Sequence, residues 1–435
     1  MIFRTLSLLA FGLVLPASAG RAPALVPGVL PGIASALPRE KPLRASVQQD
    51  ASGQQDARGP ALRLELFDGR TVLARTERVA TTRGGGVTWL GRFEGQPGAY
   101  AAFAAHGEVV MGTVFENGLA YEVRGDLATG LVLKERQSHA CVCTTVRPGR
   151  FGHDSGRTAA ATATTGGPSG PPPYPGPVLG GTSLGVKAPG PTSLPLPLEP
   201  VADLLFVWTQ EAEDLLGGAS AAQAMVDLAV LETNVVLDNS ESILDVRLVH
   251  SQQIAGYVEA QDMAVDLDRL LAPADGFLDG VHALRDQYGA DAVALLLADD
   301  DACGRSVNMS SLTSGFADYA FTLVSQSCAT TNWALAHELG HTFGLDHDRL
   351  NTSSTPSHPF AYGFWLANGV YRSMMALPRW GVTGVRIPYY SNPGLLYLNQ
   401  HVLGVPYPGN QSSDCRLALD LNAKVIASWR PTQVP

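Results

Sequence analysis

The chain has 435 residues, of which 45% are apolar and 16% are charged. That length allows two or three domains, and the apolar content excludes a wholly disordered protein. The net charge of −10 argues against a nucleic-acid-binding protein, which would carry a basic surface. Five cysteines are an odd number, so at least one has no disulfide partner within the chain.

Residues 1–19 have the pattern of a signal peptide. Arg4 provides a positive charge, Leu6–Leu15 is apolar, and Ala17-Ser18-Ala19 offers the small residues of a cleavage site. The apolar run is shorter than the roughly 20 residues of a membrane-spanning helix, and no later segment is expected to cross a membrane. The sequence therefore predicts a soluble, secreted protein in which disulfides are permitted.

Residues 20–150 are predicted to form a β-rich domain. Leu62–Phe67 alternates apolar and polar residues, Asp68-Gly69 is a typical hairpin turn, and Thr71–Leu73 resumes the alternation. Further strand patterns follow at Val87–Gly91, Tyr100–Ala105, Val109–Phe115 and Leu119–Val123.

A change in composition marks residues 151–200, where glycine and proline make up 21 of 50 residues. Such a segment buries too little apolar surface to offset its chain entropy, which predicts an extended linker. The linker separates halves of opposite charge, because residues 1–200 carry a net +5 and residues 201–435 a net −15. Two explanations of this contrast are equally good. The halves attract each other, or each half carries its charge only to stay soluble.

Strand and helix patterns alternate in residues 201–435. The strand patterns are Leu204–Trp208, Ile243–Val249 and Ala292–Leu297, and the helical patterns are Ala221–Val236 and Phe277–Gln287. Alternation of this kind is typical of an α/β fold with a largely parallel sheet.

A histidine-rich motif, HELGHTFGLDHD, occupies residues 337–348. Thr331 or Asn332 is expected to cap a helix that runs through the first part of the motif. In that helix His337 and His341 lie one turn apart on one face. This spacing suits two nitrogen ligands of a single zinc ion.

The rest of the motif completes a metal site. Gly344 can end the helix at positive φ, after which the chain turns back and lets His347 supply a third ligand. Three neutral imidazoles that leave a fourth position open are typical of a catalytic zinc site. Glu338 lies beside the first ligand, where its carboxylate can act on a water at the metal without binding the metal. The motif therefore predicts one catalytic Zn²⁺ ion and hydrolysis of peptide bonds.

The motif closely resembles the HExxHxxGxxH signature of the metzincin zinc endopeptidases. Asp348 after the third histidine resembles the adamalysin/reprolysin branch. Cys303-Gly304, Cys328 and Tyr389–Pro393 resemble the bacterial secreted members of that branch. Downstream, Arg372–Ala376 resembles the Met-turn of the family, in which Met375 would underlie the zinc and Met374 would be its neighbour.

The resemblance also implies an architecture. Residues 201–435 would be a catalytic domain with a twisted, mostly parallel sheet, one antiparallel edge strand and an active-site helix. The β-rich residues 20–150 would be a propeptide, which they resemble less specifically.

Further positions follow from the resemblance. Cys303 and Cys328, on either side of a strand region, are expected to form a disulfide in an exported chain. Ser306–Ser310 would lie near the cleft, where an extended substrate pairs with the edge strand, and Arg386–Tyr390 would form a wall of the S1′ pocket. Cys415 stands where a non-cysteine residue is expected.

Cys141 and Cys143 lie near the end of the predicted propeptide, just ahead of the linker. A thiolate binds Zn²⁺ tightly, so either cysteine could block the metal and keep a zymogen inactive. Their surroundings lack the usual switch consensus, and a strained Cys141–Cys143 bridge or a bond from either one to Cys415 are alternatives. Cleavage in the linker would leave a mature enzyme that begins near residues 190–200.

Together these features predict a secreted zinc endopeptidase, made as a zymogen, that acts on proteins or peptides and is inhibited by its own propeptide. A metzincin-fold binding or toxin-like module with little turnover is one alternative, and a zinc hydrolase of other bonds is another. The complete set of His337, Glu338, His341 and His347 favours the endopeptidase. Asp299–Asp301 could bind Ca²⁺, but the pattern favours a solvated acidic turn.

Overall fold

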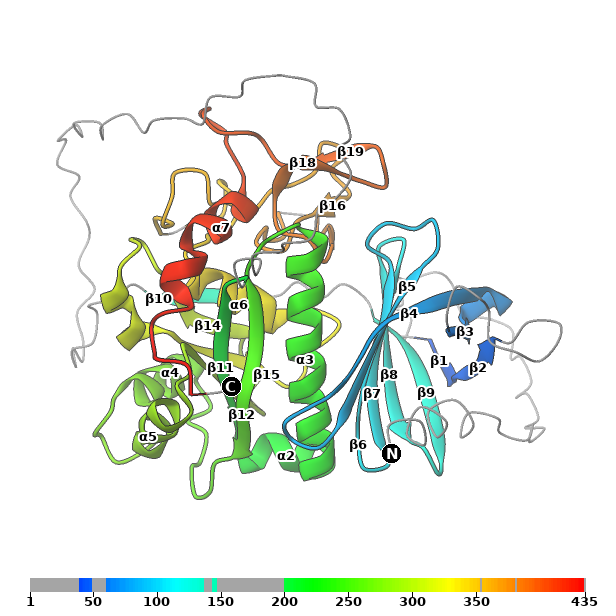
Figure 1. The fold of residues 1–435 in the computed structure, drawn as a ribbon, viewed down its shortest axis with the longest axis horizontal. Coiled ribbons are helices and arrows are strands. Elements are labelled where there is room, and N and C mark those ends of the chain that lie inside the picture. The colour runs from blue at the N-terminus through cyan, green and yellow to red at the C-terminus, as the bar shows by residue number, and fades with distance from the viewer. Residues whose placement is uncertain are drawn as a thin grey trace, which may run out of the picture. The chain divides into compact units, whose positions relative to one another are not determined.

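Two large β-sheets organise the chain (Figure 1). The computed structural model describes residues 39–48, 60–136, 143–146, 199–352, 354–379 and 382–433. The signal peptide at 1–19 and nearly all of the linker at 151–200 fall outside these residues. Both segments, and the domain boundaries drawn from them, stay predictions.

The first half forms one antiparallel sheet of nine strands, in the order β1-β9-β8-β7-β6-β5-β4-β3-β2. Its strands are β1 (Glu40–Pro42), β2 (Arg44–Gln48), β3 (Ala61–Glu65), β4 (Thr71–Thr81), β5 (Val87–Phe93), β6 (Tyr100–His106), β7 (Val109–Glu116), β8 (Leu119–Asp126) and β9 (Gly130–Arg136). The six predicted strands coincide with β3 to β8, and a short 3-10 turn, Phe67–Gly69, makes the predicted hairpin connection. Strands β1, β2 and β9 have no counterpart in the prediction. We call β1 to β9 the N-terminal sheet.

Strand β6 is buried on both of its faces. Tyr100 and Ala102 belong to the apolar cluster that includes helix α3 (Ala219–Asn239), whereas Ala101 and Phe103 belong to a separate cluster on the other face. Successive side chains of a strand point to opposite faces, so unbroken burial requires cover on both. The N-terminal sheet therefore packs against the second half of the chain through α3.

The second half is built on a six-stranded sheet in the order β10-β14-β15-β13-β11-β12. Its strands are β10 (Cys143–Val146), β11 (Val201–Trp208), β12 (Asp245–Gln253), β13 (Ala292–Leu297), β14 (Gly304–Val307) and β15 (Phe321–Ser325). Strands β12, β11, β13 and β15 are parallel neighbours, and β14 is antiparallel to β15. The predicted α/β arrangement is therefore present in this half.

Among the strands that come from residues 201–435, the antiparallel strand β14 is the outermost on its side of the sheet, as the resemblance implies. Strand β10, from the segment before the linker, pairs with β14 in parallel and covers its outer side. An open sheet edge carries unpaired N–H and C=O groups, and an extended segment of the same chain satisfies them here.

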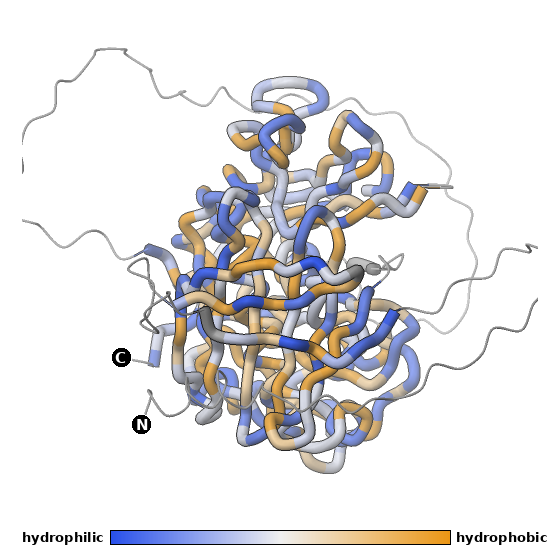
Figure 2. Tube along the Cα trace, turned by 90° about the vertical axis from the view of Figure 1, so that its right-hand side faces the viewer, coloured by the Kyte–Doolittle hydropathy of each residue, from blue (hydrophilic) through white to orange (hydrophobic). Residues whose placement is uncertain are grey.

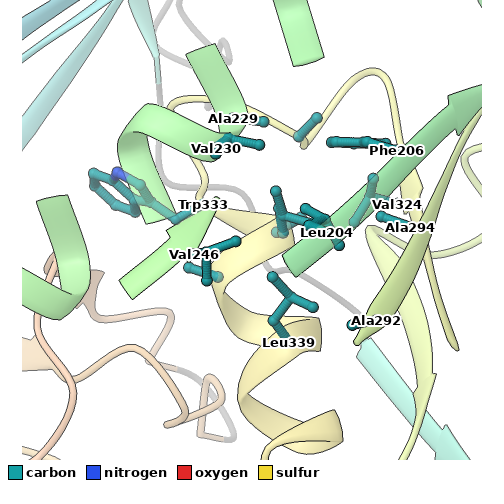
Figure 3. Close-up of a cluster of buried hydrophobic side chains, with 14 of the residues drawn as sticks. Leu204, Phe206, Ala229, Val230, Val246, Ala292, Ala294, Val324, Trp333 and Leu339 are labelled. Atoms are coloured by element: carbon teal, nitrogen blue, oxygen red, sulfur yellow. The ribbon is translucent and has the colours of Figure 1, made fainter. Parts of the chain in front are cut away.

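Helix α3 is buried around almost its whole circumference. It packs against β12 of the second sheet and against β6 and β7 of the N-terminal sheet. Figure 3 shows Ala229 and Val230 of α3 in one apolar cluster with Leu204 and Phe206. Contrary to expectation, α3 is long and apolar enough to cross a membrane, but 89% of its most apolar window is buried inside the protein.

The remaining elements surround the second sheet. The helices are α2 (Gln210–Leu216), α4 (Met263–Leu271), α5 (Asp279–Tyr288), α6 (Ala334–Thr342) and α7 (Cys415–Ile426), and the short strands are β16 (Tyr371–Arg372), β17 (Val385–Arg386), β18 (Asn392–Tyr397) and β19 (His401–Leu403). The side chains of Thr209 and Asp414 cap α2 and α7 by accepting backbone hydrogen bonds. Figure 2 shows hydrophobic stretches within the strands and hydrophilic stretches in many outer turns.

Charge contributes modestly to the contact between the two halves. Arg78 and Asp238 form an ion pair at 3.7 Å, with both side chains partly exposed. Such pairs contribute about 0–1 kcal/mol, so the apolar contact between the N-terminal sheet and α3 outweighs the opposite net charges.

Candidate metal centre and active site

Helix α6 carries the first part of the histidine motif, but the residue that caps its N-terminus differs from the prediction. Neither Thr331 nor Asn332 caps it; the N-cap is Trp333, which has a φ of 53° and makes no side-chain cap hydrogen bond. Thr331 is also left-handed, with a φ of 59°. Such backbone costs roughly 1–3 kcal/mol per residue and persists only where the surroundings impose it. Here Trp333 is 3% exposed and its indole N–H donates to the Tyr100 hydroxyl at 2.7 Å.

Three histidine side chains converge in the second half. His337 and His341 lie one turn apart in α6, and His347 returns to them after Gly344, whose φ is 96°. The Nε2 atom of His347 lies 3.3 Å from that of His337 and 3.0 Å from that of His341. The ligand atoms of the three buried residues all lie within 4.8 Å of one another. The structure thus brings the predicted ligand set together.

Backbone carbonyls orient two of the three imidazoles. His337 Nδ1 lies 2.9 Å from the carbonyl oxygen of Met374, and His341 Nδ1 lies 3.0 Å from that of Leu345. A carbonyl oxygen only accepts, so these bonds assign the ring proton to Nδ1 and leave the Nε2 lone pair facing the other histidines. Second partners of this kind are typical of histidines that bind a metal.

Burial keeps the three imidazoles neutral. It lowers the pKa of His337 well below the ordinary value, that of His341 to about 4 and that of His347 to about 3. The positive charge of Arg386 lowers the pKa of each histidine further. Because a metal binds the neutral imidazole, the site is ready for a metal at neutral pH.

The donor set fits a zinc ion. Neutral imidazole nitrogens are preferred zinc ligands, and three of them leave a position for substrate or water. Within the described ranges, this is the one group of histidine, cysteine and acidic residues whose ligand atoms lie so close together. Asp299–Asp301 forms no such group, so the structure adds no support for a calcium ion.

Glu338 is fully buried beside the first histidine. The hydroxyl of Ser306, in β14, donates to Glu338 Oε2 at 2.7 Å. Gly304 permits this approach, because a Cβ at that position would lie 2.5 Å from Cγ of Glu338. The carboxylate therefore has a fixed orientation next to the metal ligands, where it can accept and return a proton. Sequence spacing alone does not reveal the contact with Ser306.

The predicted Met-turn lies against α6. A Cβ on Gly340 would lie 2.6 Å from Sδ of Met375, so this thioether packs directly against the helix between the two histidines. Met374 instead contributes the carbonyl that orients the first histidine. The N–H of Leu377 donates to Oδ2 of Asp348 at 3.1 Å, which ties the end of the histidine motif to the turn.

Comparison with known proteins agrees with this geometry. Residues 200–377 match the Reprolysin_5 family, described as metallo-peptidase family M12. Together with the relatives below, this match supports a metzincin-like zinc metalloprotease. The chain is a hydrolase that acts as a metallo-endopeptidase.

Three relatives of this metalloprotease are each named peptidyl-Asp metalloendopeptidase. The protein from Xanthomonas campestris pv. campestris is 28% identical over 92% of this chain and 89% of its own length. The protein from Stenotrophomonas maltophilia strain K279a is 26% identical over 89% of this chain and 88% of its own length. A third, from strain R551-3, is 30% identical over 52% of each chain. The first two alignments extend over both halves of the metalloprotease.

The structure gives the pairing state of three of the five cysteines of the metalloprotease. Cys303 and Cys328 form the disulfide expected from the family resemblance. Cys415 is buried and free, and burial raises its pKa to about 12. The alternative of a bond from Cys141 or Cys143 to Cys415 is therefore wrong. Cys141 lies outside the described residues, and only the backbone of Cys143 is described.

The two segments expected to bind substrate both contact α6 of the metalloprotease. In Ser306–Ser310, the backbone N–H of Met309 donates to the carbonyl of His341 at 3.1 Å. In Arg386–Tyr390, the Tyr390 hydroxyl donates to the carbonyl of Ala336 at 2.6 Å. Both segments are therefore held beside the metal site.

Arg372 is a supporting residue to which the sequence pattern assigns no role. Its side chain is fully buried and donates to the carbonyls of Ala376 and Thr383, which holds the Met-turn in shape. Its one signal in the sequence is its position directly before the Met-turn, and nothing in the spacing shows that it is buried.

Proposed function

We propose that this metalloprotease is a secreted enzyme, made in latent form, that hydrolyses the peptide bond on the amino side of aspartate. The observation that carries its chemistry is the buried convergence of His337, His341 and His347 beside Glu338. Three protein ligands and an adjacent carboxylate suit hydrolysis, whereas a structural zinc site normally has four protein ligands.

The side chains of the site have different roles in hydrolysis. When bound by the three histidines, a zinc ion would polarise the scissile carbonyl and make water more acidic. Glu338 accepts the proton of the attacking water on its carboxylate and delivers it to the leaving amine. Ser306 keeps this carboxylate oriented through its hydrogen bond to Oε2.

The substrate class is taken from the relatives named peptidyl-Asp metalloendopeptidase. A peptidyl group is the acyl part of a peptide, so a peptidyl-Asp bond is one whose amide nitrogen belongs to aspartate. We extend this preference to the present enzyme because two of these relatives align with about nine-tenths of it.

Contacts of the first half support latency. Strand β10 pairs with β14, where an extended substrate is expected to bind. A side chain on Gly118 of the N-terminal sheet would lie 2.9 Å from the ring of Tyr371, and one on Gly98 would overlap the Tyr389 hydroxyl. The sheet thus packs against the segments that follow the histidine motif, as an inhibitory propeptide would.

A cysteine switch remains part of the proposal. Cys143 lies opposite Gly304 in the strand register, and Gly304 lies close to the side chain of Glu338. This register supports a role for Cys143, or for Cys141 two residues earlier, as a thiolate that blocks the metal. The signal peptide at 1–19 supports secretion and is consistent with the disulfide.

Quenched fluorescent peptides test the proposed activity. We expect the processed enzyme to cleave an Xaa–Asp peptide at least about tenfold faster than the matching Xaa–Asn peptide. A zinc chelator should abolish cleavage and added Zn²⁺ should restore it, while mass spectrometry of the products locates the bond. A processed protein that binds zinc and cleaves no peptide would favour the binding module instead.

Removing β10 from the sheet tests latency. Proline has no N–H, and adjacent residues of a strand direct their N–H groups to opposite sides, so Thr144→Pro with Thr145→Pro removes at least one hydrogen bond to β14. A loss of about 1–2 kcal/mol would raise the activity of the unprocessed protein about 5- to 30-fold. The matched Thr144→Val with Thr145→Val variant keeps both N–H groups and should stay latent. Equal rates for the two variants, measured on protein of verified intact mass, would contradict the role of β10.

A further inference from the structure

A small cavity lies at the start of helix α6. It measures about 40 Å³, and its wall includes Asn332, Trp333, Val385 and Arg386. Trp333 precedes the metal ligand His337 by one helical turn, about 5.4 Å, and its carbonyl accepts the His337 N–H at 3.1 Å. The cavity therefore adjoins the metal site on the side of the helix N-terminus.

Arg386 brings a buried positive charge to this cavity. The residue is 3% exposed, and its Nη1 donates to the carbonyl oxygen of Asn332 at 3.0 Å. Its backbone pairs with Arg372, which leads directly into the Met-turn. Two segments that belong to the active site, the start of α6 and the Met-turn, therefore position this guanidinium.

The cavity is chemically suited to an anion. None of its ten described lining residues is acidic; its two arginines are Arg136, which pairs with Glu122 at 2.8 Å, and Arg386 of the catalytic half. A guanidinium offers a planar fork of donors that matches a carboxylate.

We propose that Arg386 selects aspartate on the carboxyl side of the scissile bond by pairing with its side-chain carboxylate in this cavity. This inference rests on the proposed peptidyl-Asp activity and deepens it by naming the selecting residue. The Cα of that aspartate is bonded to the nitrogen of the scissile amide, so its side chain must enter a space next to the metal. Arg386 belongs to the catalytic half, whereas Arg136 belongs to β9 and would leave with the propeptide.

The N-terminal sheet closes the same cavity in the intact chain. Phe115, Gly118, Ala120 and Arg136 complete its wall, and the ring of Phe115 packs edge-on against Trp333 with the centroids 5.4 Å apart. Loss of the sheet would open the cavity to solvent. The surface around Arg386 that would select aspartate is therefore the same surface that the N-terminal sheet covers in the latent protein.

Peptides that differ only in the residue after the scissile bond test this role. Wild type, Arg386→Met, Arg386→Gln and Arg386→Lys, each produced as the full chain and processed, are assayed on peptides with Asp, Asn, Leu or Lys at that position. The ratio of kcat/KM for Asp to that for Asn, within one preparation, is independent of the amount of folded enzyme. Arg379→Met is the matched control, because Arg379 is an exposed arginine in the segment between β16 and β17.

We expect wild type and Arg379→Met to prefer Asp over Asn by about 10- to 100-fold, the range for a hydrogen-bonded charged group. In Arg386→Met and Arg386→Gln the ratio should fall to within about threefold, and Arg386→Lys should be intermediate. A full preference for Asp in the two neutral variants would overturn the role of Arg386 and leave peptidyl-Asp cleavage standing. Equal loss on all four peptides would assign Arg386 to structure and also overturn it. A wild type without any preference for Asp would refute the proposed substrate class itself.

Discussion

Replacing Glu338 by glutamine is expected to lower kcat for peptide hydrolysis by about 10²–10⁴-fold, the range for a lost general base. The amide keeps the shape of the side chain and can still accept the hydrogen bond from Ser306, but it cannot take up a proton. Glu338→Ala should be similarly inactive. Both variants should retain about one zinc ion per chain, because Glu338 is not among the three histidine ligands.

The measurement combines kcat/KM on an Xaa–Asp peptide with the zinc content of the same sample. Glu241→Gln is the matched control, since Glu241 is exposed just beyond the end of α3 and should leave both quantities unchanged. Undiminished hydrolysis by Glu338→Gln would refute the proton-transfer role. Loss of zinc together with activity would instead make Glu338 a residue that maintains the site.

The second large effect concerns pH and the contact between the N-terminal sheet and α3. Glu232 of α3 accepts a hydrogen bond from the Tyr100 hydroxyl at 3.3 Å, and Asp227 accepts one from the Thr82 hydroxyl at 2.9 Å. Burial raises the pKa of Glu232 to about 7 and that of Asp227 to about 6. Both carboxyl groups are therefore partly or fully protonated near pH 6 while the sheet covers them.

These shifts favour the contact at low pH. Undocking would expose both carboxyl groups and return the pKa of Glu232 towards 4.5 and that of Asp227 towards 3.8. The docked state thus binds protons more tightly, and the stabilisation is complete below about pH 4 and is lost as the pH rises through 6 to 7. One pKa unit corresponds to a tenfold change in an equilibrium constant, and the two shifts add, so we expect the affinity to fall about 10²- to 10³-fold between pH 5 and pH 8.

A nicked form of the full chain allows this measurement. In the Glu338→Gln background, a protease site inserted between residues 151 and 198 separates the halves, and their dissociation constant is followed from pH 5 to pH 8. Glu232→Gln should reduce the fall to about tenfold, the part due to Asp227, whereas Glu241→Gln should leave the pH dependence unchanged. An affinity that does not vary with pH in the unmodified interface would contradict the predicted role of the buried carboxyl groups.

Local geometry explains why the metal centre could be predicted from the sequence. The helical period brings His337 and His341 to one face, and Gly344 at positive φ returns His347 to the same place. Strands β3 to β8 and β11 to β13 could also be predicted from the sequence, since each has a clear alternating or continuous apolar pattern.

Long-range packing accounts for what the sequence pattern missed. The cap of α6 falls on Trp333 rather than on Thr331 or Asn332, because contacts of Trp333 with the N-terminal sheet impose a left-handed backbone that propensity disfavours. The orientation of Glu338 by Ser306 depends on the proximity of β14 to α6, which no spacing in the sequence encodes.

The sequence by itself determined the class of chemistry, the three histidines proposed as zinc ligands and the proposed general base, because these residues lie within eleven positions of one another on one helix and its return. It also determined that two halves of unlike charge and composition are joined by a segment rich in glycine and proline. Only the tertiary structure decided that β10 covers β14 and that Arg386 is buried beside the first turn of α6. Both depend on residues more than 50 positions apart along the chain, and only packing of the whole fold brings such residues together.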